Sequence, residues 1–278
     1  METEKVLYEE LTPAEFRLRL RRTPIAFLPL GTLEYHGEHL PFGVDGIVPR
    51  EFFVQLARRV GGIVLPMLFM GPDKTYADWQ GQELRVRQAQ RGPVFDPEAQ
   101  TRRESIEGPL YGMECYWRLP KESWGKLDGN CYWQLDAHFQ RQVCDVLKGL
   151  QRVGFKIVVA HGHAPSRRMF AKLAPEWEKH FGLRLFTCDR PEAEGPGLLT
   201  DHGAANETSL MMALRPDLIA EEVLIEGAAC PLRGVWGQNP REFASADGGR
   251  WIMEQDLGRM QGILQNALAE IAGKTDGT

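Results

Sequence analysis

Residues 155–166 have the sequence FKIVVAHGHAPS, in which an apolar, β-branched run ends at two histidines. A short apolar run of this kind is typical of a strand that is buried on both faces. The segment PIAFLPLG (24–31) has the same character and is also followed by polar residues. Segments with helical spacing of apolar residues follow or precede these strands, over about 46–61, 131–153 and 166–181. This alternation predicts an α/β fold with three α/β/α layers and a mostly parallel central sheet.

The composition is that of an ordinary globular protein. The chain has 278 residues, of which 43% are hydrophobic and 26% are charged, so it is long enough for a well-buried core. Its net charge of −5 gives no general attraction for phosphates, so we expect a small-molecule substrate and neither a nucleic-acid nor a membrane partner. We expect a cytoplasmic protein, because the sequence shows no secretory signal, no membrane span and no CxxC pair.

A long irregular stretch interrupts the pattern at about residues 71–130. It is rich in glycine, proline, charges and aromatic side chains, and it has no sustained period. We expect one domain over residues 1–278, with this stretch inserted as a lid or binding loop. Core or lid packing is the simpler role for the tryptophans in and beside it, but some of them could line a substrate pocket. The candidates for that second role are Trp79, Trp124 and Trp133.

Several smaller elements can also be predicted. Thr12 and Glu15 have the spacing of a capping box for a helix over 13–22. Asp45 or Gly46 stands where the cap of the helix over 46–61 is expected. The segment GGIVLPMLF (61–69) has the pattern of a second buried strand, and EEVLIEG (221–227) that of an edge strand.

Five of the seven histidines gather in three short segments, namely EYHGEH (34–39), HGH (161–163) and DHGAANETS (201–209). The first two segments follow predicted strands, and ligands of such sheets bind beyond the carboxyl ends of the strands. Neutral imidazole and carboxylate groups without thiolates suit zinc, manganese or iron, and they leave positions open for water and substrate. The candidate metal ligands are Glu34, His36, Asp45, His163 and Glu207.

The spacing of these residues favours a site with two ions. Glu34 and His36 leave an extended chain from the same face, so each could contact one of two adjacent ions, and the two oxygens of Asp45 could bridge them. Two metals about 3.5–4 Å apart with a bridging hydroxide are a recurring device for hydrolysis. A histidine would then pass a proton to the leaving group.

Each residue also has a simpler role when it is considered alone. Asp45 could cap a helix, and Glu207 could interact with a helix dipole. His39 and His161 could serve only as hydrogen-bonding groups, and Glu38 is expected to face solvent. We nevertheless favour a site, because all of these residues fall near the ends of strands of one sheet.

The segment LPLGTLEYHGEHLPFGVD (28–45) resembles the signature of the creatininase family, which runs roughly LPxGSxEQHGxHLPxxTD. GFKIVVAHGH (154–163) is similar to the strand of that family that ends in NGH. DHGAANETS (201–209) resembles its HAGxxETS segment, and GVWGQNPREFASADGGR (234–250) its GxxGDPxxAxxxxG stretch. The resemblance covers about residues 22–70 and 131–265.

This resemblance implies a creatininase-like fold, a hydrolase with two metals, and assembly as a homo-oligomer, commonly a hexamer. Members of the family open cyclic or linear amide bonds, and some relatives act on formamides, peptides or oxidised cyclic sugars. The resemblance gives the following roles: Glu34 and His36 as ligands, Asp45 as the bridging aspartate, His163 as the histidine of NGH, His202 as the catalytic residue that transfers a proton, and Glu207 as the ETS glutamate.

The sequence departs from the family at the second motif. Creatininase has a ligand glutamate where this chain has Pro165, so Glu207 is the natural replacement. His161 stands in place of the asparagine of the family's NGH motif, and we expect it to contact substrate. We expect His39 to contact the metal ligands without binding the metal itself.

The predicted function is hydrolysis of a C–N amide bond, in a cyclic amide or a formamide. The expected cofactors are two divalent ions per subunit, zinc or manganese or both, with iron as a further option. Three alternatives stay open. They are a hydrolase that opens a cyclic keto-sugar or keto-inositol, a non-catalytic metal- or ligand-binding protein on the same fold, and a protein with a single structural zinc ion.

Overall fold

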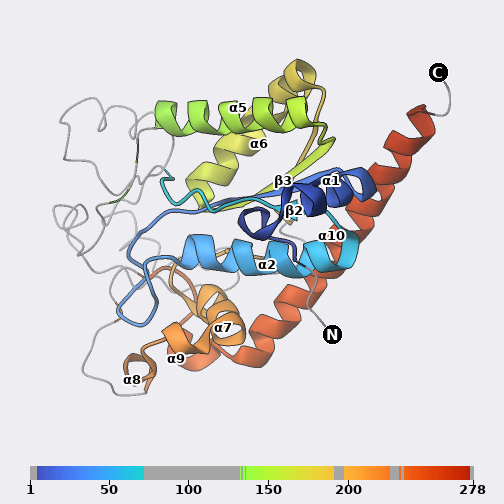
Figure 1. Ribbon diagram of the computed structural model, residues 1–278. Coiled ribbons are helices and arrows are strands. Elements are labelled where there is room, and N and C mark those ends of the chain that lie inside the picture. The colour runs from blue at the N-terminus through green and yellow to red at the C-terminus, as the bar shows by residue number, and fades with distance from the viewer. Residues whose placement is uncertain are drawn as a thin grey trace.

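The computed structural model describes residues 5–71, 132, 134, 136–190, 197–225, 232 and 235–275. These residues build one parallel sheet with helices on both faces (Figure 1). The strand order is β2-β1-β3-β4. The strands are β1 (Ile25–Leu30), β2 (Ile63–Val64), β3 (Ile157–Gly162) and β4 (Arg184–Thr187). The predicted insertion at about 71–130 lies, apart from its first residue, outside the described residues.

The central strands β1 and β3 are buried on both faces, as their apolar runs predict. They pair in register from Ile25 opposite Ile157 to Leu30 opposite Gly162. Successive side chains of a strand point to opposite faces. Phe27 of β1 accordingly packs into one core cluster, whereas Leu28 packs into the other.

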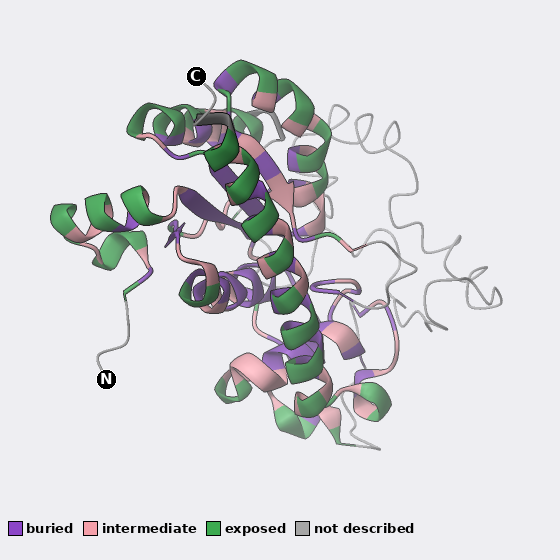
Figure 2. Ribbon diagram, turned by 90° about the vertical axis from the view of Figure 1, so that its right-hand side faces the viewer, coloured by how far each residue is buried: buried purple, intermediate pink, exposed green. Residues whose placement is uncertain are grey.

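The helices form the two outer layers of the sandwich (Figure 1). The first core cluster joins the sheet to α2 (Val44–Val60), α7 (Ala205–Leu214) and α10 (Ala246–Thr275). The second joins it to α5 (Asp136–Val153) and α6 (Ala164–Phe181). Figure 2 shows buried residues in the strands between the layers and exposed residues along the outer side of α10. The predicted three-layer α/β/α fold is therefore confirmed.

Shorter elements complete the described chain. They are η1 (Tyr8–Glu10), α1 (Pro13–Arg22), η4 (Pro216–Leu218), α8 (Glu221–Leu224) and α9 (Pro240–Phe243). Helix α1 begins with the predicted capping box, in which the Thr12 hydroxyl accepts from the Glu15 N–H and the Glu15 carboxylate accepts from the Thr12 N–H. Among the described helices, none is long and apolar enough to cross a membrane.

Two predictions of local structure were wrong, and a third element is present but shorter than predicted. Helix α2 has Gly43 as its N-cap, so Asp45 lies within the first turn instead of capping it. The predicted second buried strand is present as β2, but it covers only Ile63–Val64, because Pro66 has no N–H to donate to a ladder. The expected edge strand at 221–227 begins as helix α8, in which Val223 packs against Ala204 and Val235. That packing outweighs the β-propensity of the segment.

Candidate metal centre

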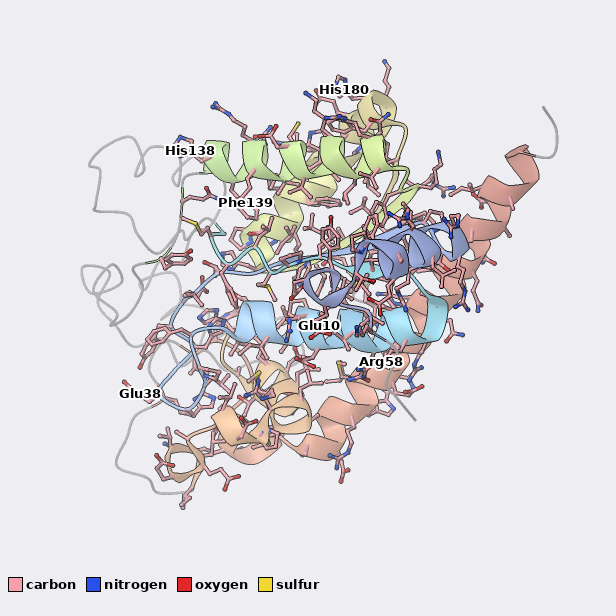
Figure 3. All side chains as sticks on the ribbon, viewed as in Figure 1. Glu10, Glu38, Arg58, His138, Phe139 and His180 are labelled. Carbon is pink, nitrogen blue, oxygen red and sulfur yellow. The ribbon has the colours of Figure 1, made fainter. Side chains whose placement is uncertain are left out.

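The loop between β1 and α2 carries three of the predicted ligands. It leaves the sheet after Leu30 and returns at Val44, where α2 begins. The Glu34 N–H donates to the Phe42 carbonyl at 3.1 Å, which closes the loop and brings Glu34 toward Asp45 in the first turn of α2. The predicted ligand residues of this loop are buried, while Glu38 is exposed on the same loop (Figure 3).

The end of β3 adds an imidazole to this group. His163 is the residue that precedes α6, and its Nδ1 lies 2.8 Å from Asp45 Oδ2 and 3.5 Å from Glu34 Oε2. Glu34, Asp45 and His163 therefore form one set of side chains whose ligand atoms are close enough to hold a metal ion.

Asp45 also belongs to a second group of this kind. His36 Nε2 lies 3.7 Å from Asp45 Oδ2 and 3.6 Å from Glu207 Oε2. The ligand atoms of His36, Asp45 and Glu207 could also hold one ion. Because both groups contain Asp45, a single carboxylate joins them, which is the arrangement expected of a bridging ligand.

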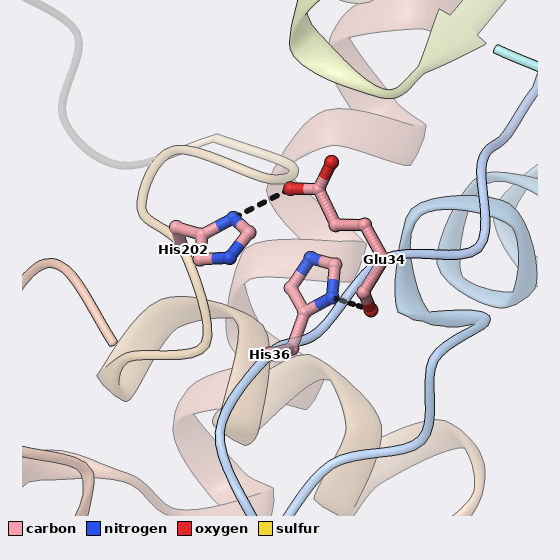
Figure 4. Close-up of side chains that lie close together, drawn as sticks. All are labelled: Glu34, His36 and His202. Carbon is pink, nitrogen blue, oxygen red and sulfur yellow. Dashed lines mark hydrogen bonds and ion pairs between the residues drawn. The ribbon is translucent and has the colours of Figure 1, made fainter. Parts of the chain in front are cut away.

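His202 lies beside the Glu34 carboxylate (Figure 4). Its Nδ1 is 3.1 Å from Glu34 Oε1, and its Nε2 is 2.8 Å from the Tyr35 carbonyl oxygen. The ring stacks on that of His36, with 4.2 Å between centroids. His202 also forms a third possible ligand group with Glu34 and His36, so its imidazole is within reach of the same centre.

The chain folds tightly between His202 and Glu207. Gly203 has φ +60°, and a Cβ on it would lie 2.6 Å from the His36 carbonyl oxygen, so only glycine lets this turn approach His36 so closely. The Gly203 N–H donates to Glu207 Oε2 at 2.6 Å. Asp201 accepts from the N–H groups of Asn206 and Glu207 at the start of α7. These bonds fix the Glu207 carboxylate toward the centre.

The electrostatics of the site reflect several carboxylates buried side by side. Burial raises the pKa of Asp45, but the charges of His36 and His163 outweigh it and hold the pKa well below its usual value. Burial lowers the pKa of His36, yet Asp45 and Glu207 raise it to about 10. Burial raises the pKa of Glu207 well above its ordinary value, despite the charge of His36. The centre therefore stabilises positive charge strongly.

The donor set fits a divalent metal ion. Imidazole nitrogens and carboxylate oxygens are ordinary ligands of zinc and manganese. Among the described residues, His36 Nε2 is buried and has no hydrogen-bond partner. Its distances to Asp45 and Glu207 are too long for hydrogen bonds. A buried polar atom without a partner is costly, and a shared cation would satisfy it.

The remaining predicted site residues lie around this centre or outside the described chain. His39 is buried, and its Nε2 lies 3.0 Å from the Thr208 hydroxyl, so it ties the ligand loop to α7. His161 is fully buried on β3, where burial and the charge of Arg167 lower its pKa to about 3. Its expected contact with substrate stays a prediction. Trp79, Trp124 and Trp133 lie outside the described residues.

Sequence reasoning missed two groups that shape the site. Asp201 caps the start of α7, and an acidic residue a few positions before a predicted helix was a usable signal for it. The Tyr35 carbonyl fixes one nitrogen of His202, and no feature of the sequence indicates a role for a main-chain oxygen.

Part of the sequence matches a known protein family. Residues 9–84 match the creatininase family model, described as creatinine amidohydrolase. A 70-residue stretch is 34% identical to creatinine amidohydrolase of Pseudomonas putida and covers 25% of this chain. The match spans about a quarter (27%) of that protein's length. The likeness to the family model thus includes the loop after β1 that holds Glu34, His36 and Asp45.

Solved structures extend the likeness over almost the whole chain. A crystal structure of creatinine amidohydrolase (creatininase) superposes with a TM-score of 0.62 at 21% identity, covering 95% of this chain and 98% of that one. The chain has the creatininase fold, and its sequence resembles the creatininase family over residues 9–84. A manganese form of creatininase gives a TM-score of 0.61 at 20% identity, and a Zn–Zn form of a creatininase variant gives 0.60 at 19%. Both cover 95% of this chain and 98% of theirs.

Pro165 stands where the resemblance to creatininase leads us to expect a ligand glutamate, and the structure shows which carboxylate lies near the centre instead. Pro165 lies at the beginning of α6 and offers no ligand atom. The Glu207 carboxylate reaches His36 from α7 instead. A carboxylate thus lies within reach of the centre, although it comes from a different segment of the chain.

Proposed function

We propose that this protein is a metal-dependent hydrolase of the creatininase family that cleaves a C–N amide bond in a cyclic amide or a formamide. The observation that carries the proposal is that Asp45 is shared by two groups of potential metal ligands. Glu34, Asp45 and His163 would hold one divalent ion, and His36, Asp45 and Glu207 the other. Such ions would supply activation of water and polarisation of the scissile carbonyl group.

A main-chain hydrogen bond orients one of the proposed ligands. The His36 Nδ1 lies 2.9 Å from the Glu34 carbonyl oxygen, to which it donates, and this leaves Nε2 to face Asp45 and Glu207. All of the proposed ligands are buried, so they would exclude bulk water from the reacting groups.

His202 is suited to carry the proton. A carbonyl oxygen can only accept a hydrogen bond, so Nε2 of His202 carries hydrogen and donates to Tyr35. In the neutral ring, Nδ1 is then free of hydrogen and lies beside Glu34. Burial and the charge of His36 lower the pKa of His202 to about 3, which keeps the ring neutral at pH 7. The contact of its imidazole with Glu34 supports His202 as the group that would transfer a proton from the attacking water to the leaving nitrogen.

The test combines metal content with turnover. Elemental analysis of the purified protein, followed by a hydrolysis screen of creatinine, other cyclic amides, formamides and cyclic keto-sugars, should give two ions per chain and activity on an amide. Asp45→Asn should lose both ions and turnover. Glu38→Gln is the matched control, because Glu38 lies on the same loop but is exposed.

The other outcomes separate the alternatives. One ion per chain without turnover would favour a structural zinc site. A metal-free protein whose Asp45→Asn variant behaves as the parent does would favour a binding protein. Activity on a keto-sugar but on no amide would retain a hydrolase and change the bond that is cleaved.

We also infer a single domain over 1–278 and a homo-oligomeric assembly, for which the family resemblance is the support. Sedimentation velocity over a range of concentrations measures the assembly, and a concentration-independent monomer would contradict it.

A further inference from the structure

A strained turn precedes His202 in the chain. Residues 197–200 form this turn, and Leu199 within it has φ +52°. Among the described residues, Leu199 is the only one other than glycine with positive φ. A left-handed conformation is unfavourable for a residue with a Cβ atom, so the surroundings must hold it.

The side chain of Leu199 explains why glycine does not occupy this position. Leu199 is only 4% exposed and belongs to the core cluster between the sheet and α2, α7 and α10. Burial of the leucine side chain offsets the backbone cost. The turn is therefore held partly by packing, but packing alone does not satisfy its main-chain carbonyls.

Arg167 satisfies two of these carbonyls. Its guanidinium Nη1 donates to the Leu198 carbonyl oxygen at 3.3 Å and to the Leu199 carbonyl oxygen at 3.1 Å. Its Nε forms an ion pair with Asp189 at 3.0 Å, which orients the guanidinium plane. The two ends of the turn are held by Asn206, which donates to the Gly197 carbonyl and accepts from the Thr200 N–H.

Arg167 also belongs to the helix that begins at His163. It lies in α6 one turn after His163, and its N–H donates to the His163 carbonyl at 3.0 Å. One residue thus links the His163 end of β3 to the turn that leads to His202. These two histidines approach the centre from separate segments, and both lie beside Glu34.

We propose that Arg167 is a positioning residue, which holds the turn 197–200 in its left-handed form and thereby sets the place of His202 beside Glu34. The inference rests on the proposed function for the role of His202 in proton transfer, but the link between Arg167 and the position of His202 does not. A displacement of a catalytic group by about 1 Å can lower the rate about a hundredfold, so this link matters for turnover.

The structural part of the test uses Arg167→Met, which keeps most of the apolar side chain and removes all donors. Crystal structures of the parent and the variant, grown under the same conditions, should show Leu199 of the variant out of the positive-φ region and its His202 Nδ1 displaced from Glu34 Oε1. Amide hydrogen exchange at Thr200–Gly203 should accelerate. Unchanged exchange together with an unchanged Leu199 conformation would overturn the proposal, whether or not the protein is a hydrolase.

The kinetic part separates positioning from a general structural role. With the best amide substrate, kcat of Arg167→Met should fall about 10- to 100-fold while KM and zinc affinity change less than about threefold. Arg167→Lys should recover part of kcat, because an ammonium group can still donate to both carbonyls. Arg59→Met is the control, since Arg59 pairs with Glu254 between α2 and α10 and should leave kcat unchanged.

Failure of the role proposed for Arg167 can be distinguished from failure of the proposed function. A parent protein that binds no metal and hydrolyses no substrate would refute the proposed function and leave the exchange and crystallographic results to decide the role of Arg167. An active parent whose Arg167→Met variant keeps its full kcat would refute the positioning role alone.

Discussion

Asp45 and His163 are 118 positions apart in the chain, yet Asp45 Oδ2 lies 2.8 Å from His163 Nδ1. The contact joins the first turn of α2 to the end of β3. It forms because β1 and β3 are parallel neighbours, so that the segments after both strands leave the same edge of the sheet. Asp45 therefore connects the two halves of the proposed centre.

Substitution of His163 should weaken metal binding at one of the two proposed ion positions more than at the other. His163→Gln removes the imidazole from the group with Glu34 and Asp45, whereas His36, Asp45 and Glu207 keep all of their ligand atoms. We expect metal content to fall from two ions per chain to one, with loss of hydrolysis. Elemental analysis measures this, with exposed His180→Gln as the control. Two ions bound with parental affinity in His163→Gln would exclude His163 as a ligand.

Removal of metal should lower the stability of the whole fold. The proposed ligands come from segments that are distant in the sequence, so an ion binds the folded chain and not the unfolded one. A ligand at 100 to 1,000 times its Kd stabilises the folded state by about 3–4 kcal/mol. Thermal unfolding with and without a chelator should show a lower Tm in the chelated parent. Asp45→Asn should show no such shift in Tm. An equal Tm of the parent with and without the chelator would contradict the proposed centre.

Gly203→Ala should damage both stability and turnover. The new methyl group would lie 2.6 Å from the His36 carbonyl oxygen, at a residue with φ +60°. We expect a loss of at least about 1–2 kcal/mol in the free energy of unfolding, together with reduced hydrolysis as His202 moves. Gly262→Ala is the control, because it lies within α10 with open space around it and should raise stability by about 0.5–1 kcal/mol. Equal effects of the two substitutions in urea unfolding would show that the close approach to His36 is unimportant.

His39 should lower the free energy of unfolding of the metal-free protein as the pH falls. Burial, followed by the charge of His36, lowers the pKa of His39 from 6.5 to about 4. The unfolded chain therefore binds an additional proton between these values, so the contribution of His39 is present above pH 6.5 and is lost as pH falls toward 4. This single group adds a slope of at most about 1.4 kcal/mol per pH unit. His39→Gln should flatten the stability profile in that window, while exposed His138→Gln should not.

Much of the fold could be predicted because the decisive patterns are local. The buried runs of β1 and β3, the capping box of α1 and the helical spacing before Gly61 and Gly182 all appear in the structure. The proximity of Glu34 to His163 could also be expected, since both follow parallel strands.

Other features depend on tertiary contacts that a sequence pattern does not contain. The start of α8 follows from packing of Val223 against residues of other segments. The position of His202 depends on a main-chain oxygen of Tyr35 and on the turn that Arg167 holds. The sequence placed Glu207 among the candidates, but only the folded chain brings its carboxylate to His36.

The place of His36 between two carboxylates has a consequence for how an ion would enter. Without metal, its raised pKa of about 10 means that a proton occupies the position where an ion would bind. Binding of a metal ion by His36 then requires release of this proton. Affinity for zinc or manganese should accordingly rise with pH, and binding heats measured in buffers of different ionisation enthalpy should report the released protons.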